Sequence, residues 1–158
     1  MIVQANNALL MAIVIVLATA TTLRSQPAQK LSDRQHACDQ AQTQAEITQC
    51  ASEQYHKADA RLNAVYRKAL DSMQKDLSDA QIAKDADQTK HSLEAIEKLK
   101  AAEKVWIQYR DLHCEATRYQ YEGGSISSTM WASCMEQTTL NRIEELKSVY
   151  EDEDRKLE

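Results

Sequence analysis

A stretch of 95 residues, from 28 to 122, contains neither glycine nor proline, and the whole chain of 158 residues has only 2 glycines and 1 proline. Sandwiches and barrels of β-strands need a turn about every 8 to 12 residues, and such turns depend heavily on these two residue types. Hydrophobic residues nevertheless make up 43% of the chain, which is enough to build a packed core. The sequence therefore predicts an all-α fold.

The glycine-free stretch cannot be a single helix, because 95 helical residues would extend over about 140 Å. The apolar period is lost between Ser78 and Thr89, so we expect a break there. Ser78, Asp87 and Thr89 are the candidate N-caps of the helix that follows.

Apolar residues recur at steps of three and four in three segments, and each such stripe predicts one helix with a buried face. The first stripe is Tyr55, Ala58, Leu62, Val65, Ala69 and Met73. The second is Leu93, Ile96, Leu99, Ala102, Trp106, Tyr109 and His113. The third is Met135, Thr139, Ile143, Leu146 and Tyr150.

The three stripes can be buried only against one another, which predicts an antiparallel three-helix bundle or helical hairpins. We expect a single domain over residues 31–150, with a short segment before the first helix. The third helix is expected to fray into a charged tail at residues 151–158.

Residues 1–25 are expected to be a signal peptide. The unbroken apolar run from Ala8 to Leu17 is followed by Ala18-Thr19-Ala20, a small-x-small sequence that predicts cleavage near Ala20. The run is shorter than the roughly 20 residues of a spanning helix. Basic residues are missing before it, which leaves an uncleaved membrane anchor as the alternative. We therefore predict a periplasmic or secreted protein.

The four cysteines agree with export, because an even count in a small exported domain is typical of disulfides. Cys114 and Cys134 lie ten residues on either side of Gly124, so a helical hairpin turning at that glycine would bring them together. Cys38 and Cys50 can pair only if the chain between them folds back. Among three possible connectivities we favour these two pairs. Zinc is the alternative, suggested by His36 and His113 beside cysteines, but the usual ligand spacing is missing.

Charge limits the class of partner. Residues 1–30 contain no acidic residue and two of the 19 basic ones, so residues 31–158 carry 17 basic and 24 acidic side chains, a net charge of −7. That balance disfavours nucleic acid and is typical of a protein that meets a basic partner.

Polar residues on the predicted helices can meet inside the bundle. Asp59 and Asn63 are one turn apart, so they are candidates to receive the guanidinium of Arg110 or Arg142 from a neighbouring helix. We interpret them as a structural network that fixes helix register, with a ligand site as the alternative. Tyr66 and Trp106 are interpreted as core aromatics.

Signs of catalysis are weak. Ser125 follows the glycines, but the G-x-S-x-G motif of a nucleophilic serine is missing, and the four histidines are scattered. Carboxylates such as Glu97 and Glu103 lie beside lysines, as on a solvated helix face. We predict a protein that is not an enzyme and needs no cofactor.

Taken in order, these motifs resemble the family of the LprI-type lysozyme inhibitor, N-terminal domain, whose members are small exported bacterial helical proteins. The resemblance covers about residues 38–147. It consists of Cys38, Cys50, Asp59-x2-Leu62-Asn63-x2-Tyr66, Trp106-Ile107-x-Tyr109-Arg110-Asp111-x2-Cys114, Gly123-Gly124-Ser125, Cys134, Thr138, Arg142 and Leu146.

The resemblance implies binding to lysozyme and protection of peptidoglycan. The candidate partner-binding loop, Glu122, Gly123, Gly124, Ser125 and Ile126, would be held at its base by the expected Cys114–Cys134 bridge. Its other interpretation is an ordinary turn between helices. The alternative function is a helical interaction module of the cell envelope that does not inhibit lysozyme.

Overall fold

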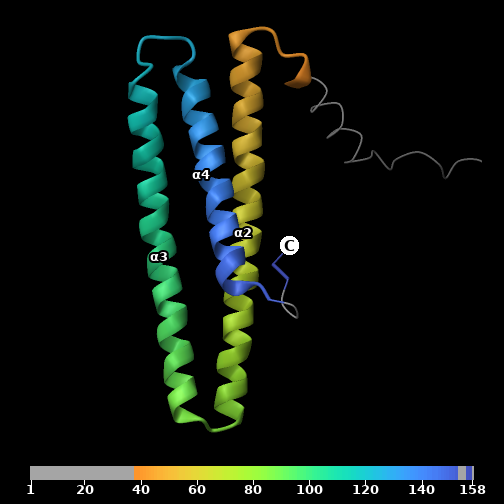
Figure 1. Cartoon of the computed structure of the whole chain (residues 1–158), viewed down its shortest axis with the longest axis vertical. Helices are drawn as coiled ribbons and strands as arrows, with labels where there is room; N and C mark the ends of the chain where they lie inside the picture. Colours follow the sequence, from red (N-terminus) through yellow and green to blue (C-terminus); the bar gives the residue numbers. More distant parts are fainter. Residues whose placement is uncertain (1–37, 153–155, 158) are drawn as a thin grey trace, which may run out of the picture. The chain divides into compact units, whose positions relative to one another are not determined.

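The protein forms an antiparallel bundle of three long helices, as the sequence predicts (Figure 1). The computed structural model describes residues 38–152, 156 and 157, and no β-strand occurs in that part of the chain. The helices, labelled as in Figure 1, are α2 (Gln44–Ile82), α3 (Ala86–Tyr119) and α4 (Ser127–Tyr150).

The expected signal peptide, residues 1–25, lies outside the described residues. None of the helices that the structure does describe has an apolar stretch sufficient to span a bilayer.

The core lies where all three helices meet. One cluster of buried side chains there consists of Leu62, Val65, Ala69, Leu99, Ile143, Leu146 and Leu157. The stripes predicted for the first and third helices supply most of them, so those two faces are confirmed. Burying each Leu, Val or Ile side chain of this cluster contributes roughly 1.5–3 kcal/mol, and this hydrophobic contribution holds the bundle together.

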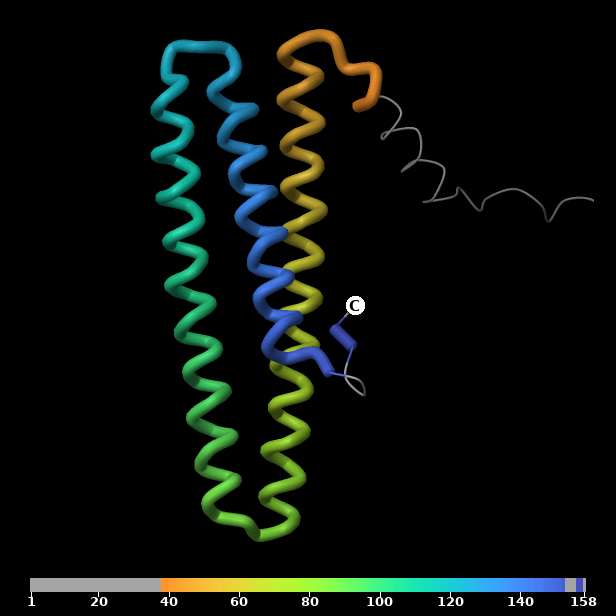
Figure 2. Tube along the Cα trace, viewed as in Figure 1, coloured from red at the N-terminus to blue at the C-terminus, as the bar shows by residue number. Residues whose placement is uncertain are grey.

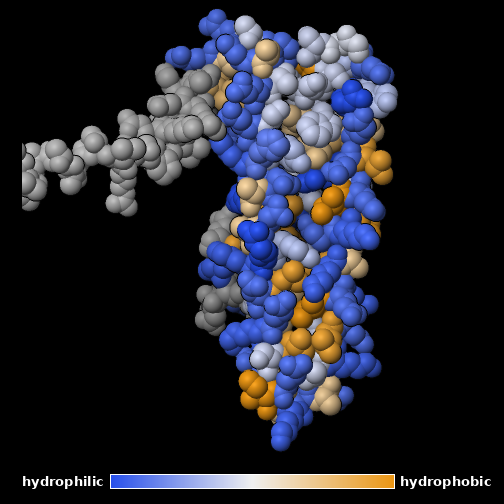
Figure 3. Space-filling model, turned by 180° about the vertical axis from the view of Figure 1, so that it is seen from behind, coloured by the Kyte–Doolittle hydropathy of each residue, from blue (hydrophilic) through white to orange (hydrophobic). Residues whose placement is uncertain are grey.

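The helices differ in length, and this leaves one end of the bundle with two layers only. Helix α2 has 39 residues and α3 has 34, whereas α4 has 24. Figure 2 shows the turn between α2 and α3 extending well beyond the end of α4. In that part of the molecule, hydrophobic residues lie on the surface seen from behind (Figure 3).

The buried face of α3 differs from the predicted stripe. The buried residues are Ser92, Ile96, Leu99, Glu103, Arg110 and Cys114. Leu93, Ala102, Tyr109 and His113, which were expected to be buried, are exposed. The apolar pattern misplaced the helix face because two charged residues, Glu103 and Arg110, occupy core positions.

The break expected between Ser78 and Thr89 is present, at residues 83–85. None of the three candidate N-caps, Ser78, Asp87 and Thr89, caps the following helix. Asp85 is the N-cap of α3, and its side chain accepts a hydrogen bond from the backbone N–H of Gln88. The chain reverses at Lys84, which has a positive φ of 58°. Glycine is the residue that usually takes such a conformation, so the sequence did not mark this turn.

The C-terminal tail also departs from the prediction, because it does not simply fray into solvent. After α4 ends at Tyr150, Leu157 returns to the core and is 2% exposed. Its backbone N–H donates to the Glu151 carboxylate at 3.2 Å. A single apolar residue in a charged segment thus covers the bundle near the end of α4.

Both expected disulfides are present. Cys38 pairs with Cys50 and Cys114 with Cys134, each with Cα atoms 5.5 Å apart. The chain folds back before Thr43, whose side chain caps α2 in a capping box with Glu46. The first disulfide therefore ties this incoming segment to α2, and the second joins α3 to α4.

Replacing Lys84 by glycine should stabilise the protein by about 1 kcal/mol, because glycine adopts positive φ without steric cost. The unfolding midpoint in urea measures this gain. The control is Ala101→Gly on an exposed part of α3, which should cost about 1 kcal/mol. A loss of stability in Lys84→Gly would contradict the left-handed turn.

Peptide mapping without reduction should recover two linked pairs, Cys38 with Cys50 and Cys114 with Cys134. Removing the second pair by a double Cys→Ala substitution should cost about 3 kcal/mol, since the bridge closes a loop of 20 residues. Any peptide that links Cys50 to Cys114 would refute this connectivity.

Candidate functional site

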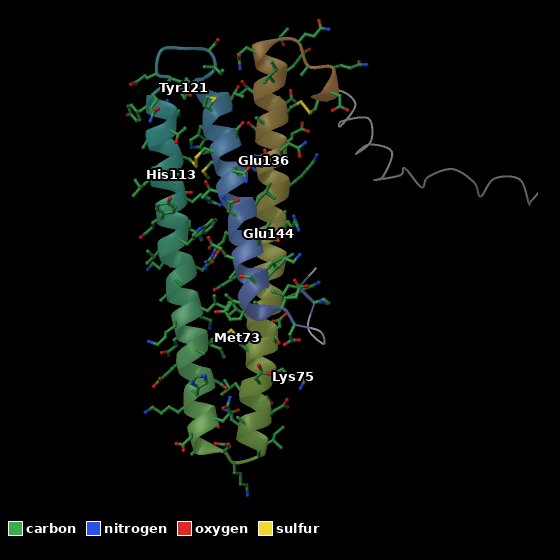
Figure 4. All side chains as sticks on the ribbon, in the orientation of Figure 1. Met73, Lys75, His113, Tyr121, Glu136 and Glu144 are labelled. Carbon is green, nitrogen blue, oxygen red and sulfur yellow. A yellow bond between two sulfur atoms is a disulfide. The ribbon has the colours of Figure 1, made fainter. Side chains whose placement is uncertain are left out.

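The loop between α3 and α4 is exposed along its whole length. Every residue from 120 to 126 is exposed, and Figure 4 shows Tyr121 at this end. The predicted loop residues, Glu122 to Ile126, therefore form a continuous accessible tip. Tyr121 and Ile126 keep 38% and 42% of their surface exposed, so the tip offers apolar as well as polar contacts.

The loop is held by its own backbone. The N–H of Gly124 donates to the carbonyl of Tyr121 at 3.1 Å, and the N–H of Ser127 donates to that of Gly124 at 3.2 Å. Gly123 has a φ of 82°, which residues with a Cβ rarely adopt. These bonds fix the turn, so little conformational freedom is left to lose on binding.

The base of the loop is joined twice. The Cys114–Cys134 disulfide connects the two helices below it. Nearer the tip, the hydroxyl of Ser127 donates to the carbonyl of Arg118 at 3.3 Å. As a result, the loop is mounted on a rigid helical hairpin.

An aromatic and charged cluster flanks the loop on α3. The guanidinium of Arg118 lies 4.9 Å from the centre of the Tyr119 ring and forms three hydrogen bonds to Glu115. These hydrogen bonds lower the pKa of the Glu115 carboxyl below its usual value and raise the pKa of Arg118. Tyr119 itself is 56% exposed, which adds a second tyrosine to this end of the protein.

The start of α2 lies at the same end of the bundle. The amide of Gln44 donates to the hydroxyl of Thr129 at 2.7 Å, and the hydroxyls of Thr48 and Thr129 also lie 2.7 Å apart. Thr129 belongs to the first turns of α4. The segment tied down by the Cys38–Cys50 bridge therefore supports the helix that carries the loop.

Further down the bundle, Arg110 crosses from α3 to the other two helices. Its guanidinium donates to Asp59 of α2 at 2.9 Å and to Thr139 of α4 at 3.4 Å. It also binds Asp111 and lies within 5.6 Å of the centres of the Tyr55 and Trp106 rings. Arg110 therefore links all three helices through polar contacts.

Electrostatics favour the charged form of Arg110. Burial on its own would lower its pKa, but hydrogen bonds to Asp59 and Asp111 outweigh burial and raise the pKa above its usual value. Burial raises the pKa of Tyr55 beside it, against the opposing effect of Arg110. The pair thus consists of a cation and a neutral ring.

A second ion pair joins α3 to α4. Arg142 lies 3.0 Å from the carboxylate of Glu103, and the two side chains are 14% and 8% exposed. Arg142 also binds Glu145 and lies 5.7 Å from the centre of the Trp106 ring. The Trp106 ring is thus within cation–π distance of both arginines, Arg110 and Arg142.

The predicted polar network is only partly the observed one. Asp59 accepts a hydrogen bond from Arg110, as expected. The Asn63 amide donates to Asp59, and the observed bonds of Asn63 include neither arginine. Tyr66 is half-buried against the core, and burial, followed by the charge of Glu103, raises its pKa.

Sequence reasoning missed Glu103 and assigned it to a solvated face. The spacing of Leu99, Glu103, Trp106 and Arg110, in steps of four, three and four, could have predicted its burial, because it places Glu103 and Arg110 on the same helix face as Leu99. Every buried side-chain polar atom in the described part of the chain has a hydrogen-bond partner. The network therefore has no unsatisfied group that calls for a ligand, which supports its structural interpretation.

Comparison with known proteins gives a family. The model of the family Lysozyme inhibitor LprI matches residues 34–146. The chain belongs to the LprI family. It is also 35% identical over 117 residues to a protein of Rhizobium meliloti (strain 1021) named Uncharacterized protein R02472, covering 72% of this chain and 78% of the relative. No solved structure matches the chain.

The LprI match includes all four cysteines and both arginines of the network. The described residues hold no group of three or more His, Cys, Asp or Glu side chains placed to share a metal ion.

Breaking the Glu103–Arg142 pair from one side should be more harmful than removing it. Arg142→Met leaves the Glu103 carboxylate buried beside α4 and should cost about 3 kcal/mol. The double variant Glu103→Leu with Arg142→Met should lie closer to the wild type, because it leaves no buried charge without its partner. Urea unfolding measures both. A double variant at least as unstable as Arg142→Met would refute this account.

Proposed function

We propose that this LprI-family protein is an exported inhibitor that binds lysozyme with its α3–α4 loop and so protects peptidoglycan. The observation that carries the proposal is the geometry of residues 120–126, an exposed tip with a fixed backbone above a disulfide-linked hairpin. A lysozyme cleft is lined by two catalytic carboxylates, and a narrow protruding tip is a suitable shape to obstruct it.

The chemistry of the tip supports this use. Tyr121 and Ile126 are the kind of partly exposed apolar anchors that contribute most of the energy in protein interfaces. At its centre, Gly123, Gly124 and Ser125 carry no charge, so the tip can approach carboxylates without repulsion. Glu122 stands at the edge, where it can meet basic residues around a cleft.

Long-range charge favours the same partner. The net charge of −7 over residues 31–158 would steer the protein toward a basic lysozyme. Two disulfides are typical of the periplasm or the extracellular space, where the protein would meet such an enzyme. The proposed action needs neither catalysis nor a cofactor.

Purified oxidised protein should slow the clearing of a cell-wall suspension by lysozyme. The inhibition constant should rise at least about tenfold in Tyr121→Ala and in Ile126→Ala, because each variant removes an apolar anchor. Raising the salt concentration from 50 to 300 mM should also weaken inhibition of the wild type, because salt screens the attraction between opposite net charges.

The matched control is Ile82→Ser, at the opposite end of the bundle, where Ile82 is 78% exposed. This variant should inhibit as the wild type does. If a large molar excess of protein leaves lysis by several lysozyme classes unchanged, the proposal is refuted. Recovery of a stoichiometric partner other than lysozyme from an envelope extract would then favour the interaction-module alternative.

A further inference from the structure

Helix α3 carries a second apolar stripe that the bundle does not use. Its members are Ala102, Val105, Tyr109, Leu112, Ala116 and Tyr119, and all six are exposed. Val105, Tyr109, Leu112 and Tyr119 keep 63%, 56%, 72% and 56% of their surface exposed. At 3.6 residues per turn, this outward stripe lies roughly 140° around the helix from the buried face. Figure 3 shows hydrophobic side chains along the edge of the molecule that α3 forms.

The spacing of the outward stripe is that of a coiled-coil seam. Steps of three and four alternate without a break from residue 102 to residue 119, as the a and d positions of a heptad do. A helix held in a folded bundle needs no further nucleation to present such a seam. The surface is therefore preorganised for a second helix with the same period.

The side chains of the stripe fit a second copy of α3 in the antiparallel direction. When each a position faces a d position of the other copy, Ala102 faces Tyr119 and Val105 faces Ala116. At the centre, Tyr109 faces Leu112. Each small residue then meets a larger one, whereas a parallel pair would place Ala102 on Ala102 and leave a void.

The exposed area is of the size that a weak dimer needs. The four large side chains of the stripe expose on the order of 400 Å² in each copy, comparable with the largest apolar patches that monomeric proteins leave uncovered. Two copies with their flanking residues approach roughly 1,000 Å², where specific interfaces begin.

We propose that the protein forms a two-fold symmetric dimer in which the outward stripes of two α3 helices pack antiparallel. The interface leaves the core face of α3 and its ion pairs unchanged. None of the six stripe residues belongs to the loop proposed to bind lysozyme, residues 120–126, so either proposal can fail without the other.

Sedimentation velocity of the purified oxidised protein from 1 to 200 µM tests the dimer. The wild type should shift from monomer to dimer as concentration rises. Leu112→Glu should raise the dimer dissociation constant at least about tenfold, because it places a charge at the centre of the apolar seam. The matched control, Val149→Glu on α4, also replaces an exposed apolar residue, 70% exposed, and should dimerise as the wild type does.

Both variants should keep the wild-type unfolding midpoint at 1 µM, where the protein is monomeric, since Leu112 and Val149 are exposed in the monomer. A wild type that remains monomeric at 200 µM, or a dimer that Leu112→Glu and Val149→Glu weaken equally, would overturn the proposal.

Discussion

The two ion pairs of α3 determine which way that helix faces. Arg110 must reach Asp59 on α2, and Glu103 must reach Arg142 on α4, so both side chains have to point inward. A buried charge without its partner costs several kcal/mol, more than the transfer of one apolar side chain. The polar contacts therefore overrule the apolar pattern of α3 and turn Tyr109 and Leu112 to the outside.

This balance explains where the sequence was a reliable guide. On α2, the apolar stripe from Ala58 to Ala69 is the buried face, because its polar partner Asp59 lies at the margin and stays partly exposed. On α3, two apolar stripes exist, and period alone cannot tell which one is inside. The choice depends on pairs of charges that lie 39 and 51 residues apart in the chain, and on the Cys114–Cys134 bridge, which holds the same face of α3 against α4.

The sequence marked one of the two turns between helices and missed the residues that form the other. The glycine pair marked the α3–α4 loop correctly, and the cysteines placed symmetrically around it formed the expected bridge. The other turn uses Lys84 in a conformation that glycine usually takes, and Asp85 as a cap next to it. The residues of the loop do not identify a partner, because exposure shows only that a surface is accessible.

Both disulfides lie toward the end of the bundle that carries the α3–α4 loop, while the α2–α3 turn at the far end has neither a cross-link nor cover from α4. Resistance to local opening is consequently graded along the long axis of the bundle. Heat or a pulling force would separate α2 from α3 at the far turn first. The cross-linked half would still hold its loop in place, so partial damage to the fold need not remove the surface that we propose to bind lysozyme.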